Sequence, residues 1–240
     1  MQKYRTLDKT RLIETLTRLD TRIRERFPER GISGVCAELL ALAPDVSATA
    51  ETLGKPIRLL RIFVFLVIAT GILLVGRLAW LIEFDGIETD GFVFFQGLEA
   101  LINVLILSGA GIWFLLTLET RIKRSRALER LHELRSIAHV IDTHQLTKTP
   151  VSVLEGGDRT ASSPERTLTP FHLRRYLDYC SEMLSLTGKL AALFAQSCRD
   201  PEVVAGASDI EQLTTALSRK IWQKIMAFSR YESGSEMAAP

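Results

Sequence analysis

The chain has 240 residues, of which 47% are hydrophobic and 24% are charged, and its formal net charge at pH 7 is +2. This composition excludes a disordered protein, because disordered chains carry few apolar residues. The small net charge gives no support for a nucleic-acid partner, which we do not expect.

Amphipathic helices are predicted in residues 1–57. An apolar residue recurs every three or four positions along the first of them, at Leu12, Leu16, Leu19, Ile23 and Phe27. This spacing places the apolar side chains on one face of a helix. A second helix is predicted over 33–43 and ends before Pro44, because proline cannot donate a backbone hydrogen bond. A short third helix follows it. The start of the chain is polar, so no cleavable signal peptide is expected.

Residues 58–120 are predicted to form a transmembrane hairpin. Its two spans cover 62–82 and 97–118, and a short external loop, 83–91, joins them. The first span contains only one charged residue, Arg77. At 1.5 Å per residue each span is long enough to cross a hydrocarbon core of about 30 Å. A pair of buried core helices in a soluble protein is the alternative.

The charges beside the spans predict their orientation. Basic residues stand before the first span and after the second, at Lys55, Arg58, Arg61, Arg121, Lys123, Arg124 and Arg126. The loop contains only acidic charges, at Glu83, Asp85, Glu88 and Asp90. The positive-inside rule therefore predicts a multi-pass protein of the bacterial inner membrane with both termini in the cytoplasm. The cysteines Cys36, Cys180 and Cys198 would then be free thiols in a reducing compartment.

Polar and small residues within the spans are candidates for helix packing. Arg77 and Glu99 lie at matching depths in an antiparallel hairpin, so we predict an intramembrane polar pair. Asn103 can form hydrogen bonds between helices, and glycines allow close approach of helix backbones. The packing candidates are Gly71, Gly76, Asn103, Gly109 and Gly111, which would act within the hairpin or between subunits.

Four segments are predicted after the hairpin. Residues 121–144 continue the second span as a cytoplasmic helix with an apolar side from Leu131 to Ile141. Residues 145–169, rich in Ser, Thr, Gly and Pro, form a flexible linker. Residues 170–231 form a C-terminal helical pair. The first helix buries a broad apolar face from Leu173 to Phe194, and the second, capped by Ser208 or Asp209, carries an apolar seam from Ile210 to Phe228. Residues 232–240 form a disordered tail. No strand pattern is present, so the fold class is all-α: a membrane hairpin with a cytoplasmic helical bundle.

The segment IAHVIDTHQLTK, residues 137–148, is the main candidate for a chemical site. His139 and His144 point about 140° apart around a helix, so His132, His139 and His144 are weak candidates for a metal site. His132 and His139 share a face but stand about 10 Å apart along the axis, too far for one zinc ion. With Ser136 and Thr143 they form a stripe that faces either water or a partner.

Two further segments combine basic and aromatic residues. HLRRY, residues 172–176, and LSRKIWQK, residues 217–224, would contact lipid headgroups or an acidic partner, or form the solvated edges of amphipathic helices. The chain has no phosphate-binding, zinc-protease or nucleophile-elbow motif. No cofactor and no catalytic residue is therefore predicted.

LRSIAHVIDTHQLTK and LSRKIWQKI resemble segments of a family of bacterial two-span inner-membrane proteins, a resemblance that implies no activity. The layout, without matching motif residues, is also similar to SLATT-type two-helix effector domains of bacterial conflict systems.

The sequence predicts a non-enzymatic membrane-anchored protein that acts in assembly or regulation through helix–helix contacts. The expected partners are the lipid bilayer, further copies of the chain and a cytoplasmic protein. The seams at 12–27 and 210–228, which look unpartnered in the sequence, motivate this hypothesis. The alternatives are an oligomeric pore or membrane-disrupting effector, and metal-dependent chemistry at the histidines.

Overall fold

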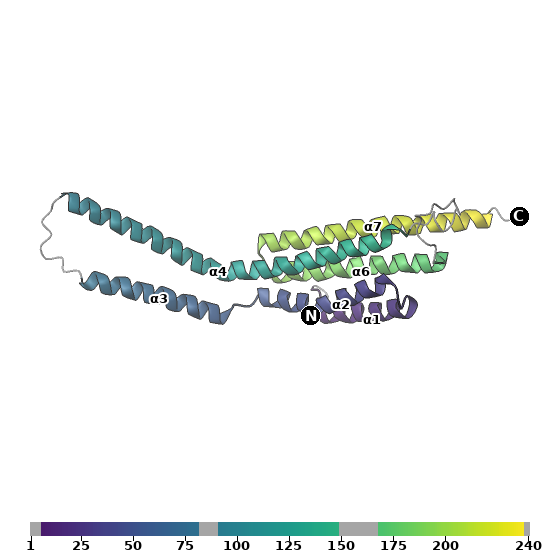
Figure 1. Cartoon of the computed structure of the whole chain (residues 1–240), viewed down its shortest axis with the longest axis horizontal. Helices are drawn as coiled ribbons and strands as arrows, with labels where there is room; N and C mark the ends of the chain where they lie inside the picture. Colours follow the sequence, from purple (N-terminus) through teal and green to yellow (C-terminus); the bar gives the residue numbers. More distant parts are fainter. Residues whose placement is uncertain (1–5, 82–90, 149–167, 238–240) are drawn as a thin grey trace. The chain divides into compact units, whose positions relative to one another are not determined.

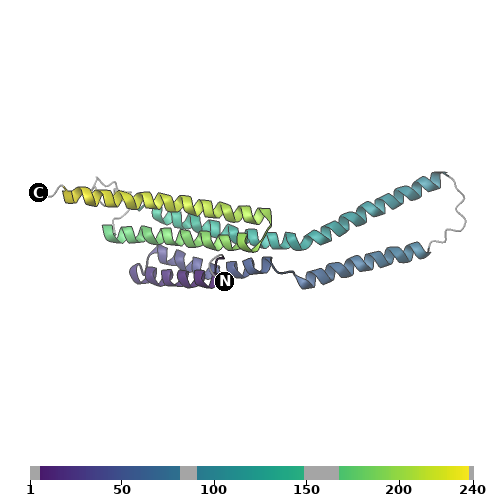
Figure 2. The same ribbon diagram turned by 180° about the vertical axis from the view of Figure 1, so that it is seen from behind.

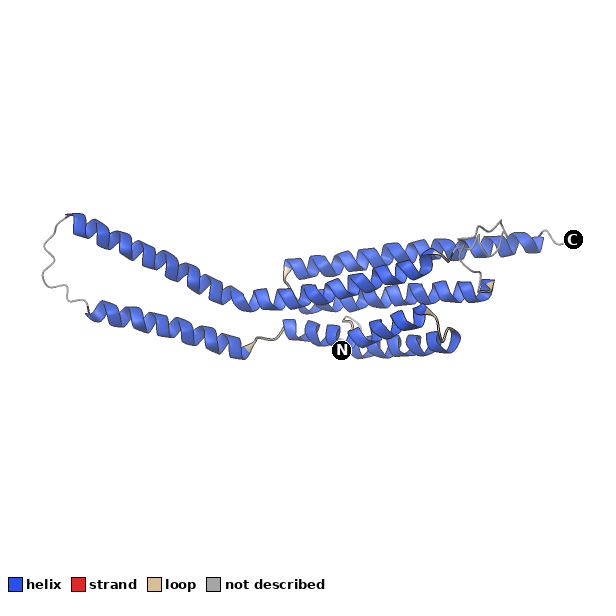
Figure 3. Cartoon of the chain, in the orientation of Figure 1, coloured by secondary structure: helices blue, strands red, loops and turns tan. Residues whose placement is uncertain are grey.

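The computed structural model describes residues 6–81, 91–148 and 168–237, and throughout these residues it is helical, without a strand (Figure 3). Six helices run through the described residues: α1 (Lys9–Arg26), α2 (Gly31–Leu53), α3 (Arg58–Leu81), α4 (Gly91–Leu146), α6 (Pro170–Ser197) and α7 (Pro201–Met237) (Figure 1). The predicted all-α fold class is confirmed. The external loop, except for its last residue, and nearly all of the predicted linker lie outside the described residues.

The chain divides into two compact units. The bundle unit consists of Met1–Gly54 and Arg126–Pro240, and the hairpin unit consists of Lys55–Ser125. Within the bundle unit, α6 and α7 run side by side and α1 lies against α2, as both views of the ribbon show (Figures 1 and 2). The second half of α4 belongs to the same unit and contributes to its core.

The bundle core is built from the apolar faces that the helical periodicity predicts. All five seam residues are buried, from Leu12 in α1 to Phe27 at the C-terminal cap of that helix. The predicted inner faces of α4 and α6 are also buried, and the largest fully buried side chains include Leu134, Ile141, Leu177 and Phe194. A fully buried side chain of this size contributes about 1.5–3 kcal/mol relative to an exposed one. Burial of these faces therefore holds the bundle together.

The apolar seams at 12–27 and 210–228, which suggested contacts with other molecules, are covered by other helices of the same chain. On α7, Ile210, Thr214, Ile221 and Ile225 are buried, as is the α1 seam. The side chain of Phe228 lies outside the described residues. These two seams therefore face the bundle's own core, and they no longer support association with a partner.

Two helix boundaries differ from the sequence prediction. α2 runs unbroken from Gly31 to Leu53 with Pro44 inside it. Pro44 is exposed, and the buried residues Ala43 and Val46 on either side hold the helix together by packing. α7 begins at Pro201, not after Ser208 or Asp209, because the Asp200 Oδ1 accepts hydrogen bonds from the backbone N–H groups of Glu202 (3.1 Å) and Val203 (3.3 Å).

The ends of the other helices follow common capping chemistry. Asp8 Oδ1 accepts from the Thr10 N–H (2.9 Å) at the start of α1, and Thr169 Oγ1 accepts from the His172 N–H (3.2 Å) at the start of α6. α7 remains helical to Met237, so residues 232–237 do not form the predicted disordered tail.

In the hairpin unit, α3 and the first part of α4 are long and apolar enough to cross a membrane. Only 6% and 0% of the residues in their most apolar stretches are buried. Core helices of a soluble protein bury most of such residues, so the two helices leave a large apolar surface uncovered by their own chain.

Candidate functional site

The predicted histidine stripe lies on the surface of α4. His132, Ser136, His139 and Thr143 are all exposed. The Ser136 hydroxyl donates to the His132 carbonyl (3.0 Å) and the Thr143 hydroxyl donates to the His139 carbonyl (2.9 Å), so both hydroxyls bond to their own helix. Within its own chain the stripe therefore faces solvent.

His144 lies apart from this stripe and connects α4 with two other helices. Its ring lies against Gly31 at the start of α2, where any Cβ would collide with the ring. Its carbonyl accepts a hydrogen bond from the Tyr176 hydroxyl (3.4 Å) on α6. The structure does not bring His144 together with His132 and His139, and no group of three His, Cys, Asp or Glu residues among the described ones can hold a metal ion.

A polar network at the end of α4 uses other residues of the same segment. Gln145 is fully buried, and its amide donates to the Asp142 carboxylate. Lys224 of α7 donates to the Gln145 Oε1 (2.6 Å) and to the backbone carbonyls of Gln145 (2.9 Å) and Lys148 (3.4 Å). Lys220, one turn earlier, lies 3.4 Å from Asp142. A cation thus caps the carbonyl end of α4, where the helix dipole is negative.

The charge of Lys224 is affected by its surroundings. Burial lowers the pKa of its ammonium group, and neighbouring Lys220 lowers that pKa further, while Asp142 opposes the shift. Sequence analysis missed this network and assigned LSRKIWQK to a solvated edge or an external contact. The spacing of Lys220 and Lys224, one turn apart beside the buried Ile221, was the only local signal for it.

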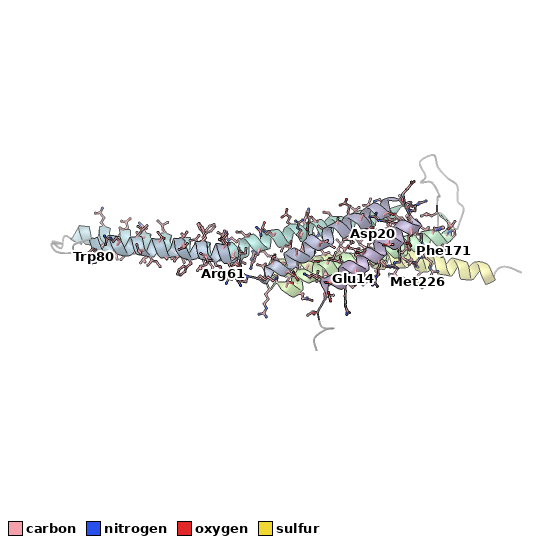
Figure 4. The ribbon with its side chains drawn as sticks, turned by 90° about the horizontal axis from the view of Figure 1, so that it is seen from below. Glu14, Asp20, Arg61, Trp80, Phe171 and Met226 are labelled. Carbon is pink, nitrogen blue, oxygen red and sulfur yellow. The ribbon has the colours of Figure 1, made fainter. Side chains whose placement is uncertain are left out.

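A second polar site joins the two ends of the hairpin unit. Glu119 of α4 accepts hydrogen bonds from the backbone N–H of Ile57 (3.1 Å) and from Arg61 (2.7 Å), and its other ion-pair partner is Lys123 (2.7 Å). Lys123 also donates to the carbonyl of Lys55 (2.6 Å). The Glu119 side chain is 13% exposed, so its contacts are better shielded than a surface ion pair. Figure 4 labels Arg61, near the first turn of α3.

Arg77 and Glu99, the predicted intramembrane pair, lie on α3 and α4 respectively. No ion pair joins Arg77 to Glu99 in the part of the chain that the structure describes. The Arg77 guanidinium lies over the ring of Trp80, 5.4 Å from its centroid, one turn along α3. Figure 4 labels Trp80. This cation–π contact within one helix satisfies part of the charge without fixing the hairpin register.

The predicted packing glycines have open surroundings. A Cβ placed at Gly71, Gly76, Gly109 or Gly111 would meet no atom within 4 Å. Asn103 is exposed, and its side-chain amide makes no hydrogen bond within residues 6–81, 91–148 and 168–237. Of the two predicted uses, packing within the hairpin is therefore not observed, and packing between subunits stays a prediction.

Arg175 of HLRRY, with Arg22 and Arg26 of α1, lines a cavity of about 380 Å³ between α1 and α6. Arg22 pairs with Glu182 (2.5 Å), and Arg175 pairs with Asp178 (3.3 Å) while lying over the Tyr179 ring at 5.0 Å. Because carboxylates balance these guanidinium groups, the cavity joins α1 to α6 and is not a strongly positive anion site.

A small buried polar site lies between α1 and α2. Asp20 Oδ2 pairs with Arg24 (2.7 Å), whereas its Oδ1 is buried without a hydrogen-bond partner in the described chain. Burial, followed by the nearby Asp20 charge, raises the pKa of the Cys36 thiol to about 12. Cys36 is therefore a neutral thiol at physiological pH and is not activated as a nucleophile.

Comparisons of the chain with protein-family models, with curated proteins and with solved structures found no match.

Proposed function

We propose that this protein is an integral membrane protein in which the hairpin anchors the helical bundle, and that it acts in assembly or regulation through helix–helix contacts, without catalysis. One observation carries the proposal: the most apolar stretches of α3 and of the first part of α4 are almost wholly uncovered by the described chain. Exposed side chains of this surface include Phe65, Leu73, Leu107 and Trp113. Lipid tails or the helices of other copies would cover them.

The flanking charges support one orientation. Basic residues at both ends of the hairpin, with acidic residues alone in the loop, favour insertion with both termini in the cytoplasm of a bacterial cell. The bundle unit would then be cytoplasmic. Its three cysteines are free thiols, which suits a reducing compartment.

The open polar and small residues of the hairpin support association of several copies. The Asn103 side-chain amide has no hydrogen-bond partner among the described residues, and an amide in hydrocarbon gains from one on a neighbouring helix. The open surroundings of Gly109 and Gly111 on the same helix would allow a second copy to approach closely.

Cysteine labelling of intact cells tests the orientation. In a Cys198→Ser background, Thr89→Cys in the loop is expected to react with a membrane-impermeant maleimide added outside. Ser235→Cys is expected to react only after permeabilisation. Equal labelling of the two sites, or release of the protein from membranes by alkaline carbonate, would contradict the membrane proposal.

Energy transfer between labelled copies in liposomes tests the association. We expect transfer for the full-length protein and a loss of several-fold in association for Asn103→Leu, which removes the amide. The neighbouring Val104→Leu, which changes size without polarity, is the matched control. A strictly monomeric protein would overturn the assembly role.

An oligomeric pore is a second candidate, favoured by the exposed Asn103 within an otherwise apolar stretch. Ion flux through the same liposomes separates the two functions. Flux that rises with protein density and falls in Asn103→Leu would favour the pore, and association without flux would favour the scaffold.

A further inference from the structure

A groove of about 420 Å³ follows the outer side of α6 and α7. Its floor is made of small residues, among them Ser185, Gly188 and Ser218. At Gly188 the two helices cross so closely that an added Cβ would lie 2.7 Å from Thr214 Oγ1. The lining residues of each helix recur three or four positions apart, which is the spacing by which one helix contacts another.

The two rims of this groove carry opposite charges. Lys189 stands on the α6 rim and Glu211 on the α7 rim. They lie at the same level along the bundle, because the Gly188 Cβ position is 3.8 Å from the Glu211 Cα. No ion pair of the described residues joins them; the Lys189 ammonium donates instead to Ser185 Oγ (2.5 Å).

Large apolar side chains stand beside the groove. Trp222, which lines its end, is 53% exposed, and Met226, one turn further along α7, is 51% exposed (Figure 4 labels Met226). The small residues of the floor form a depression, and the large exposed side chains of Trp222 and Met226 form a protrusion on the same face. A surface that carries both, together with one charge of each sign, is complementary to itself.

We propose that the groove is the contact surface for a second copy of this chain. In this arrangement α6 of each copy lies against α7 of the other. Lys189 pairs with the partner's Glu211 and Glu211 pairs with the partner's Lys189, so the contact contains two equivalent ion pairs. Trp222, at the end of the groove, is covered by the partner, and exposed aromatic side chains of this kind often contribute strongly to an interface. This inference rests on the proposed assembly function and identifies the surface through which two copies associate.

Charge-reversal variants of the full-length protein in liposomes test the pairing, with energy transfer between donor- and acceptor-tagged copies as the measurement. K189E alone and E211K alone are each expected to weaken association about tenfold, because each creates like charges across the interface. An equal mixture of the two variants is expected to restore association, since each K189E copy then faces an E211K copy. Pairing within one chain cannot give this result, because both variants keep like charges within the chain.

Control variants separate this contact from general charge effects. R18E and E14K make the same charge changes on the exposed side of α1, away from the groove, and are expected to leave association unchanged. Circular dichroism confirms that each variant is folded. If a charge variant does not fold, W222A tests the same surface and is expected to weaken association.

The outcomes distinguish this inference from the proposed function. Association that is equal in wild type, K189E, E211K and W222A would overturn the groove contact and leave assembly through the hairpin standing. A mixture that fails to regain the association lost by two folded variants would also overturn it. An absence of energy transfer in the wild type would overturn both.

Discussion

Glu119 connects the two helices of the hairpin unit through a single carboxylate. It accepts from the backbone N–H of Ile57, directly before α3, and from the two cations Arg61 and Lys123. The N–H groups at the start of a helix have no partner within the helix, so the carboxylate satisfies one of them while neutralising nearby positive charge. Its position directly after the apolar span suits a residue that fixes where the two helices meet.

Glu119→Gln is expected to accelerate amide hydrogen exchange in residues 57–61. The neutral amide no longer attracts Arg61 and Lys123, and charge-assisted hydrogen bonds contribute about 1.5–3 kcal/mol each. Exchange at the Ile57 N–H should rise by roughly tenfold or more. Mass spectrometry of the protein in detergent micelles measures it, with exposed Glu14→Gln as control. Unchanged exchange in residues 57–61 would show that the carboxylate does not hold the start of α3.

The three cysteines are expected to differ in reactivity. Burial raises the pKa of both Cys36 and Cys180 to about 12, so both remain thiols at pH 8 as well as being inaccessible. Cys198 is half-buried at the turn before α7. Native protein should therefore gain one iodoacetamide label, and denatured protein three, as measured by intact mass. In Cys198→Ser the native protein should gain none, and a native label on Cys36 would contradict the packing of α1 on α2.

At the scale of single helices, Pro44 gives a test of how packing overrides local preference. Proline inside a helix removes one hydrogen bond, here to the Leu40 carbonyl, and its ring crowds that carbonyl. Because Pro44 is exposed and α2 continues through it, Pro44→Ala should raise the free energy of unfolding by about 1–3 kcal/mol. Thermal unfolding followed by circular dichroism measures the change. A lower melting temperature in Pro44→Ala would mean that the proline itself, and not only the flanking packing, stabilises α2.

The cap on α4 gives a second test at this scale. Lys224→Met removes the donor to a buried Gln145 and to two carbonyls, which should cost about 1–3 kcal/mol. Lys220→Met is the matched control: its ion pair with Asp142 is longer and its side chain is 46% exposed, so we expect a loss below about 1 kcal/mol. Equal losses in the two variants would show that the cap contributes nothing beyond surface charge.

These helices also show how far local sequence patterns reach. Periodicity predicted the buried faces of α1, α4 and α6 because burial of one face follows directly from residue spacing. Patterns did not predict the start of α7, where Asp200 and Pro201 outweighed the later candidate caps. Nor did they predict the pairing of Gln145 with Lys224, which lie 79 residues apart. Contacts across that separation depend on which helices become neighbours, and helical spacing alone does not decide this.

At the scale of the whole molecule, the same limit applies to the candidate sites. The exposed histidine stripe follows from helical geometry, whereas the Glu119 site and the α6–α7 groove each combine two helices. The seams at 12–27 and 210–228 looked unpartnered because a sequence does not show which of its own helices will cover them. The structure turns both seams toward the bundle core, whereas the apolar hairpin and the groove are uncovered by the described chain.

The division into two units predicts that the bundle folds without the hairpin. Its core comes from α1, α2, α6, α7 and the second half of α4, all within the bundle unit. The two ends of the hairpin unit lie close together, since Lys123 Nζ is 2.6 Å from the Lys55 carbonyl. A linker of about six Gly and Ser residues can reach up to about 20 Å and should therefore join Gly54 to Arg126 without strain.

This shortened protein is expected to be soluble without detergent, highly helical and cooperative in thermal unfolding, whereas the full-length protein should require detergent or lipid. The reason is that most of the large exposed apolar side chains among the described residues lie in α3 and the first part of α4, which the linker replaces. Circular dichroism and light scattering measure both properties. An aggregated or non-cooperative product would show that the hairpin supplies part of the bundle's stability, and that anchor and bundle form one folding unit.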